Sequence, residues 1–195
     1  SEINFNVAKS GILGIAGSNG SGKSTLVKIL TGIISPSSGK VDHLLNDKRL
    51  EPEKLHDHIG FVSPYLVLYD EFSATENIEH FARIRGINFN KEKIEKLLND
   101  FLLFNRKDDL VKTYSSGMKQ RLKFVFALMH SPQLIILDEP FTGFDPVNAN
   151  LIKREILQLK KDGCTIIFST HRMDSVEELC DDIALINKSR KILDG

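Results

Sequence analysis

The chain has 195 residues, which is enough for one sizeable α/β domain or for two small lobes that share a core. Lys plus Arg and Asp plus Glu both total 26, so no net field attracts nucleic acid or an anionic membrane, and we expect no nucleic-acid partner. Cys164 and Cys180 lack metal-ligand spacing and are expected to be buried thiols in a reducing cytoplasm. No apolar run is long enough to cross a bilayer and no signal-like leader opens the chain, so we expect any membrane span to come from another chain.

The first third of the chain is predicted to form short strands around one helix. Alternating apolar and polar residues at the start are typical of a half-buried strand, and the apolar run ILGIA is typical of a buried one. A helix is expected from about Ser24 to Gly32, and the turn sequence SPSSG follows it. The strands predicted in this part are residues 3–7, 12–16, 41–45 and 59–62.

The middle third is predicted to be helical. Ser73 and Glu76 have the spacing of a capping box before the helical sequence TENIEHFARIR, which Gly86 ends. Residues 91–104 have the pattern of a second amphipathic helix. We therefore expect residues 70–115 to form a helical subdomain inserted in the α/β core.

The last third returns to alternating helices and strands. Asp145 is expected to cap a long helix that begins at Pro146 and that Gly163 closes. The helices predicted here are residues 117–130, 146–161 and 174–180, and the buried strands are residues 134–137, 165–170 and 183–187. A single αβα core that carries a helical insertion accounts for this pattern.

The sequence GSNGSGKST, which begins at Gly17, matches the phosphate-binding pattern GxxxxGK followed by Ser or Thr. Gly17, Gly20 and Gly22 are expected to take positive φ angles and to turn successive N–H groups toward an anion at the start of a helix. Lys23 would reach the β and γ phosphates, and the Ser24 hydroxyl would bind Mg²⁺. A glycine-rich turn without a ligand is the alternative, which the preceding apolar strand and the following helix disfavour. The residues expected to hold the nucleotide are Gly17, Ser18, Asn19, Gly20, Ser21, Gly22, Lys23, Ser24 and Thr25.

A pair of carboxylates follows the apolar run LIIL. Asp138 is expected at the carboxyl end of a buried parallel strand, where it could hold Mg²⁺ opposite Ser24. Glu139 is then the candidate general base that polarises the water attacking the γ-phosphate. The alternative is that these two carboxylates only mark the solvent-exposed end of a strand, an interpretation that the nearby phosphate loop disfavours.

His171 follows another predicted core strand, in the sequence IIFSTH. A neutral imidazole at this point could hydrogen-bond near the γ-phosphate and hold the surroundings of the attacking water. A lone histidine is usually structural, but its position matches that of Glu139 and favours the functional interpretation.

Ser115, Ser116 and Gly117 precede a predicted helix in TYSSGMKQRL. The unpaired N–H groups and the dipole of a helix N-terminus favour an anion. Taken alone, this sequence indicates only an N-cap.

The order of GSNGSGKST, YSSGMKQR, LIILDEP, TGFDP and STH resembles the nucleotide-binding domain of an ABC (ATP-binding cassette) ATPase. The resemblance runs from Gly11 nearly to the end of the chain, and the serine-glycine signature separates this family from other phosphate-loop ATPases. It implies a single α/β domain over residues 1–195, with a P-loop NTPase core, a mostly parallel sheet, a small antiparallel β subdomain and a helical insertion. The end of the chain also resembles soluble ATPase subunits of bacterial exporters.

The resemblance implies a cytoplasmic ATP-binding and Mg-dependent ATP-hydrolysing subunit at the inner face of the cell membrane, which energises transport through a separate membrane-spanning permease subunit. Two such domains, identical or different, would pair head to tail. Each ATP would then lie between residues 17–24 of one domain and residues 115–117 of the other. Asp145 resembles the loop that carries signals across the dimer, and His171 resembles the switch histidine.

Non-transport members of the family are the alternative. Translation-associated members carry two cassettes in one chain, whereas only one is seen here. DNA-repair and chromosome-structure members are interrupted by long coiled coils, whereas the insertion here is only about 40 residues.

Three features depart from the family pattern. Pro64 stands where the family usually has glutamine, and proline offers no side-chain amide, so we expect Ser63 or water to complete the Mg²⁺ shell. The signature reads YSSGM where LSGGQ is usual. The aromatic residue that normally stacks on adenine would lie upstream of residue 1, so the chain is expected to be a fragment or to lack the first strands of the domain.

The apolar run YLVLYDEF lies in a predicted surface connection, between the strand that ends at Val62 and the helix near Ser73. It must bury itself against the helical part or bind another protein, and the sequence leaves both open. By resemblance, this is where a transporter cassette receives a helix of the membrane subunit. If side chains alternate, Leu66 and Leu68 point inward while Tyr65, Val67 and Tyr69 face the partner.

Overall fold

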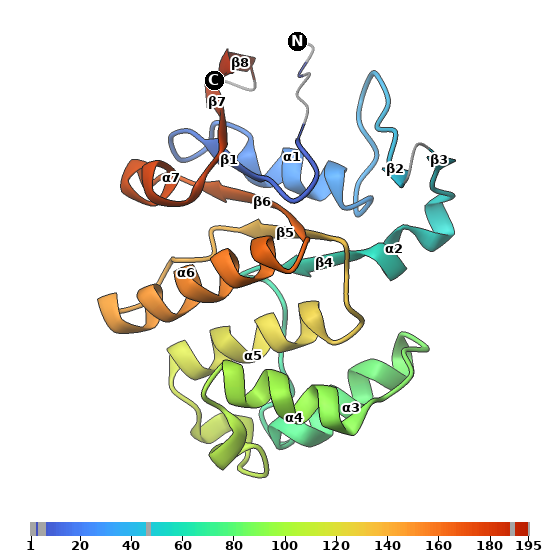
Figure 1. Cartoon of the computed structure of the whole chain (residues 1–195), viewed down its shortest axis with the longest axis vertical. Helices are drawn as coiled ribbons and strands as arrows, with labels where there is room; N and C mark the ends of the chain where they lie inside the picture. The colour runs from blue at the N-terminus through green and yellow to red at the C-terminus, as the bar shows by residue number, and fades with distance from the viewer. Residues whose placement is uncertain (1–2, 4–6, 46–47, 188–189, 195) are drawn as a thin grey trace.

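The computed structural model describes residues 3, 7–45, 48–187 and 190–194. Its centre is a six-stranded sheet with the strand order β4-β5-β6-β1-β7-β8 (Figure 1). The first five strands in that order are parallel, and β8 pairs antiparallel with β7. The strands of this sheet are β1 (Ile12–Ala16), β4 (Ile59–Val62), β5 (Leu134–Asp138), β6 (Thr165–Thr170), β7 (Asp182–Asn187) and β8 (Arg190–Asp194). A separate antiparallel hairpin joins β2 (Leu44–Leu45) to β3 (Lys48–Arg49).

Helices cover both faces of the sheet, which explains why the central strands are continuous apolar runs. Leu13 and Ile15 of β1 share one cluster of buried residues with Val27 of α1. Ile12 belongs to the cluster on the other face, which includes Ile152 of α6 and residues of α5 and α7. The helices of this core are α1 (Lys23–Leu30), α2 (Leu55–His58), α5 (Ser116–Leu128), α6 (Pro146–Lys161) and α7 (Met173–Leu179).

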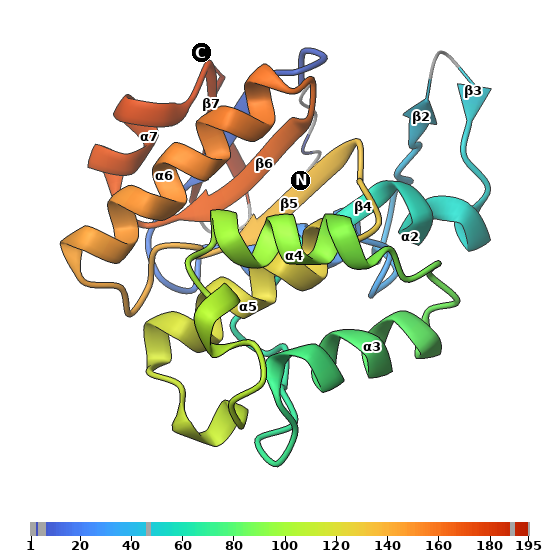
Figure 2. The same ribbon diagram turned by 60° about the horizontal axis from the view of Figure 1, so that its bottom comes forward.

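Two helices, α3 (Ala74–Ile84) and α4 (Lys91–Asp100), lie beside α5 at the end of the molecule away from β1 (Figures 1 and 2). The Ser73 side chain accepts the Glu76 N–H, and the Glu76 side chain accepts the Ser73 N–H, so the predicted capping box is confirmed. Stacked rings join the insertion to α5, with 5.0 Å between the centroids of Phe81 and Phe126. Short 3₁₀ turns at Pro52–Lys54, Phe104–Arg106 and Val111–Thr113 complete the described helical segments.

The structure corrects several predicted boundaries. Helix α4 ends at Asp100 rather than at 104, because Leu102 takes a left-handed φ of 53° and turns the chain so that its neighbours Phe101 and Leu103 enter the core. The predicted edge strand 41–45 is reduced to two residues. The sequence did not predict β3, α2 or β8. The predicted strand 3–7 falls largely outside the described residues, and neither Ile3 nor Val7 is in a strand.

The two cysteines differ from the prediction in one respect. Cys164 is buried as expected, whereas Cys180 is only partly buried. Burial raises the pKa of both thiols to about 12, which favours the protonated thiol at neutral pH. Among the described residues, no helix is long and apolar enough to cross a membrane.

The segment between β4 and α3 shows the predicted alternation. Tyr65, Val67 and Tyr69 are 70%, 82% and 52% exposed, while Leu66 and Leu68 pack against the main core. Asn77 of α3 fixes the end of this segment, because its side chain accepts the Tyr69 N–H and donates to the carbonyls of Tyr69 and Ser73, each at 2.9 Å.

We predict that Asn77→Ala lowers the free energy of unfolding by about 1–3 kcal/mol, since Asn77 is buried and its loss leaves backbone groups unpaired. Urea unfolding followed by circular dichroism measures the change. Glu79→Ala, on the exposed side of the same helix, is the matched control and should stay close to wild type. Equal stability of the two variants would contradict the anchoring role of Asn77.

Candidate nucleotide-binding and hydrolytic site

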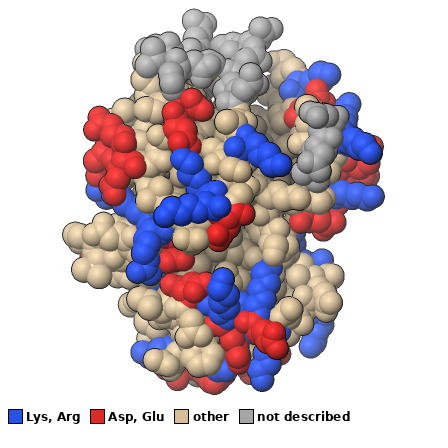
Figure 3. All heavy atoms as spheres, in the orientation of Figure 1, with Lys and Arg blue, Asp and Glu red and all other residues tan. Residues whose placement is uncertain are grey.

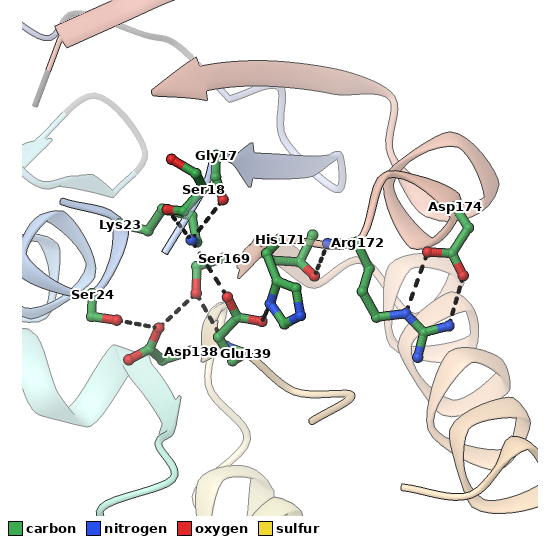
Figure 4. A network of polar contacts seen from close by, with 11 residues as sticks. Gly17, Ser18, Lys23, Ser24, Asp138, Glu139, Ser169, His171, Arg172 and Asp174 are labelled. Atoms are coloured by element: carbon green, nitrogen blue, oxygen red, sulfur yellow. Dashed lines mark hydrogen bonds and ion pairs between the residues drawn. The ribbon is translucent and has the colours of Figure 1, made fainter. Parts of the chain in front are cut away.

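The predicted site residues meet at the carboxyl ends of three neighbouring strands. Strands β5, β6 and β1 lie side by side and parallel, and their register pairs Asp138 with Ser169 and Ala16 with Thr170. The loop after β1, the acidic pair at the end of β5 and His171 after β6 therefore converge on one edge of the sheet (Figure 4). This edge is where open α/β sheets bind their ligands.

The loop at residues 17–25 leads from β1 into α1, as predicted. Gly20 and Gly22 have φ values of 77° and 105°, and Gly22 is the N-cap of α1, which no side chain caps. The prediction of a positive φ was wrong for Gly17. Glycine is required there by space, because an added Cβ would lie 2.3 Å from the Ile186 carbonyl oxygen and 2.7 Å from Ser21 Oγ.

Lys23 is 5% exposed and lies across this loop. Its Nζ donates to the carbonyl oxygens of Gly17 at 2.8 Å and Ser18 at 3.1 Å, and lies 3.6 Å from Glu139 Oε1. The charge of Lys23 is therefore placed between the phosphate-type loop and the candidate base. Asn19 and Thr25, from the same loop, are exposed.

Ser24 and Asp138 form the candidate metal site. Ser24 Oγ donates to Asp138 Oδ1 at 3.1 Å, although the two residues are 114 positions apart in the chain. Among the described residues, no group of three or more His, Cys, Asp or Glu side chains could hold a metal ion. A hydroxyl beside a carboxylate suits Mg²⁺, because this cation prefers oxygen and takes most of its ligands from water and phosphate.

Glu139 and His171 are in direct contact. His171 Nδ1 lies 3.0 Å from Glu139 Oε2, and a carboxylate can only accept, so Nδ1 carries the hydrogen. Glu139 also has a left-handed φ of 50°, a conformation that costs a non-glycine residue about 1–3 kcal/mol and that only surrounding contacts maintain.

Ser169 is a member of this network that the sequence analysis missed. Its Oγ donates to Asp138 Oδ1 at 2.6 Å and accepts the Glu139 N–H at 3.1 Å. Ser169 could have been recognised from its position two residues before His171, if β6 had been known to lie beside β5. The sequence alone did not provide this strand order.

Residues 115–117 and Asp145 lie apart from this network. Ser115 caps α5 by accepting the Met118 N–H at 3.2 Å, and Ser115 and Ser116 are exposed. Asp145 caps α6 as predicted, and its hydrogen bonds from Asn148 hold the pKa of its carboxyl below the usual value. The two helix starts are neighbours, since a Cβ on Gly117 would lie 3.3 Å from Asn148 Nδ2.

The loop with Pro64 is held by a lysine of α5. Lys123 Nζ donates to the Pro64 carbonyl oxygen at 2.9 Å, and Ser63 Oγ accepts the Tyr65 N–H at 3.2 Å. Ser63 is 6% exposed and directly follows β4, the neighbour of β5. The Ser63 hydroxyl is therefore adjacent in the sequence to Pro64, the position where the family usually has the side-chain amide of glutamine.

Charges of both signs are mixed over the face of the molecule drawn in Figure 3. Most ion pairs are at the surface, such as the pair of Lys119 with Asp70 at 2.7 Å. Exposed pairs of this kind contribute little to stability.

The space around Gly17 gives a testable difference between two glycines of the loop. Gly17→Ala should lower the free energy of unfolding by about 3 kcal/mol or more, because the added methyl meets a backbone carbonyl that cannot move alone. Gly20→Ala is the matched control, since no atom lies within 4 Å of its added Cβ and only the positive φ costs about 1–2 kcal/mol. Thermal and urea unfolding give both values. A larger loss for Gly20→Ala would contradict the steric explanation.

Comparison with known proteins identifies the family. The sequence model described as ABC transporter matches residues 1–142. The ABC transporter ATP-binding protein NatA of Bacillus subtilis is 33% identical over all of this chain and 80% of its own length. The linearmycin resistance ATP-binding protein LnrL of the same organism is 34% identical over 99% of this chain and 63% of its own length. The chain spans between 61% and 80% of the length of the curated relatives compared.

A solved structure agrees with these relatives. Clostridium perfringens cbiO1, which is part of the ABC transporter complex cbiONQ, superimposes with a TM-score of 0.84 at 30% identity, over 99% of this chain and 80% of that one. The predicted P-loop NTPase core with a mostly parallel sheet is confirmed by this likeness. The chain therefore belongs to the ABC transporter family, as an ATP-binding cassette.

Proposed function

We propose that this chain binds Mg-ATP, hydrolyses it to ADP and phosphate, and thereby energises transport through a separate membrane subunit at the inner face of the cell membrane. The observation that carries the proposal is the contact network from Lys23 and Ser24 through Asp138 and Glu139 to His171. The relatives are ATP-binding proteins of transporters, which supports this role over a translation or DNA-repair role.

The loop at residues 17–25 holds the phosphates. The uncapped start of α1 and the positive φ of Gly20 and Gly22 turn backbone N–H groups toward an anion. Lys23 adds a cation that is already fixed in place by two carbonyl oxygens, so little side-chain freedom is lost on binding.

Ser24 and Asp138 hold Mg²⁺. The cation supplies positive charge that offsets the charge of the phosphates during transfer. Asp138 is 1% exposed, so hydrogen bonds from Ser24 and Ser169 take the place of water at its carboxylate.

Glu139 is the general base and His171 positions it. Glu139 Oε2 accepts a hydrogen from His171 Nδ1, which leaves Oε1 toward Lys23 and able to take the proton of the attacking water. The strained φ of Glu139 fixes the direction of its side chain at the end of β5.

A second ATP-binding domain completes the site. Residues 115–117 start a helix and two of these residues are exposed, which supports a role toward the ATP of a partner domain. Asp145 lies at the neighbouring helix start and would take part in the same interface. This domain could be identical or different.

We also propose that residues 70–115 form a helical subdomain within a single domain. A cavity of about 150 Å³ lies where β4, the segment after it, α3 and α5 meet, and its lining includes Phe61, Leu66, Phe81 and Phe126. Leu66 belongs to the segment whose alternate residues Tyr65, Val67 and Tyr69 are exposed. An apolar, partly exposed surface of this kind supports docking of the membrane subunit. The similar protein cbiO1 is itself part of an ABC transporter complex, cbiONQ.

Two substitutions separate binding from hydrolysis. Lys23→Ala should abolish ATP binding in calorimetry, because the buried cation supplies much of the phosphate recognition.

Glu139→Gln should keep ATP binding but lower turnover by about 10²- to 10⁴-fold, as expected for loss of a general base. Turnover is measured in the assembled transporter. Normal affinity of Lys23→Ala would contradict the binding site, and normal turnover of Glu139→Gln would contradict the base.

Val67→Asp tests the docking surface. Because Val67 is 82% exposed, the substitution should leave the melting temperature and ATP affinity of the chain unchanged while it prevents co-purification with the membrane subunit. Leu44→Asp, at a residue that is 65% exposed on the separate hairpin, is the matched control and should co-purify normally. Unfolding of Val67→Asp, or its normal co-purification, would contradict the proposal.

A further inference from the structure

Ser169 lies at the meeting point of the acidic pair. It is fully buried near the end of β6, and the sheet register places it beside Asp138 of β5. The partners of the buried Ser169 hydroxyl are the two residues to which the metal and base roles are assigned.

The Ser169 hydroxyl makes two different hydrogen bonds. Its single hydrogen goes to Asp138 Oδ1 at 2.6 Å, and its oxygen accepts the Glu139 N–H at 3.1 Å (Figure 4). The donated bond is short and charge-assisted, which makes it the stronger of the two. One hydroxyl therefore joins the two carboxylate-bearing residues across two strands.

The bond to Asp138 selects one carboxylate oxygen. Ser24 Oγ also donates to Oδ1, at 3.1 Å, so both hydroxyls hold the same oxygen. Within the described part of the chain, no hydrogen bond engages Oδ2. The carboxylate plane is thus fixed, and the other oxygen is left for the metal or for a water of its shell.

The bond from Glu139 supports a strained turn. The Glu139 N–H is shared between Ser169 Oγ at 3.1 Å and the Ser169 carbonyl oxygen at 3.2 Å, at the residue whose φ is 50°. Such a conformation persists only where its surroundings determine it. Removing the hydroxyl removes one of the two acceptors that hold this turn.

We infer that Ser169 is a positioning residue of the hydrolytic site, which orients the Asp138 carboxylate for Mg²⁺ and fixes the turn that carries Glu139. The inference rests on the proposed Mg-ATP function. A hydroxyl that merely fills the end of the sheet would contribute to stability but not to the metal dependence of nucleotide binding.

The test measures ATP affinity by calorimetry on the full chain, first with excess EDTA and then with increasing Mg²⁺. Ser169→Ala should match wild type in EDTA, because residues 17–25 are unchanged. The Mg²⁺ concentration for half-maximal enhancement of ATP binding should rise by about 10- to 100-fold, the range found when partners of metal ligands are removed. Ser169→Cys nearly keeps the volume and offers a weak S–H donor, so it should fold and give an intermediate shift.

Ser175→Ala is the matched control. Ser175 is also fully buried, and its Oγ has no hydrogen-bond partner among the described residues, so its removal should leave the Mg²⁺ dependence at the wild-type value. An unshifted Mg²⁺ dependence in Ser169→Ala, or in Ser169→Cys where the alanine variant does not fold, would overturn the inference and leave the proposed function standing. A loss of ATP affinity in Ser169→Ala that is as large in EDTA as in Mg²⁺ would also overturn the inference. Absence of Mg-dependent ATP binding in the wild type would overturn the proposed function and this inference together.

Discussion

A carboxylate that has lost its water must be held by hydrogen-bond donors, and the site is arranged around this constraint at Asp138. The side chain ends a parallel strand with 1% of its surface exposed, where an unpaired charge would be costly. Its two donors, Ser24 and Ser169, come from the first turn of α1 and from β6. The carboxylate therefore connects β5 with β6 and with the start of α1. The same arrangement brings Glu139 to Lys23 and His171.

The local parts of the structure could be predicted from the sequence because short-range chemistry specifies them. β1, the helix start at Pro146 and the capping box at Ser73 follow from patterns a few residues long. The role of Ser169 could not be predicted, since it depends on which strands are neighbours. The end of α4 was missed because Leu102 takes a left-handed φ that its side chain does not favour, a conformation set by burial of Phe101 and Leu103. Glycine at position 17 was predicted from a positive φ, but it is required because the Ile186 carbonyl of β7 leaves no room for a Cβ. This contact depends on the strand order and could not be predicted from the loop sequence.

The connection from β4 to α3 links the nucleotide site to the helical insertion. Lys123 of α5 holds the Pro64 carbonyl near one end, and Asn77 of α3 holds Tyr69 at the other. Between these two anchors, only alternate side chains are buried. Pro64, which stands where the family usually has glutamine, therefore lies in a loop whose backbone is held by α5. The same helix begins with the serine-glycine signature. Two lysines of α5 contact this segment, Lys123 at the Pro64 carbonyl and Lys119 at the Asp70 carboxylate.

The position of β1 in the middle of the sheet determines when the phosphate loop can form. β1 precedes its two neighbours in the sheet, β6 and β7, by about 150 residues of chain. Pairings across such distances close late in folding, because the entropy of the intervening loop opposes them until the rest of the core has formed. During synthesis, residues 12–16 therefore wait as an unpaired apolar strand until residues 165–187 have left the ribosome. Early exposure of such a strand favours aggregation and chaperone binding. The part of the chain proposed to bind nucleotide is thus translated well before the strands that hold it in place.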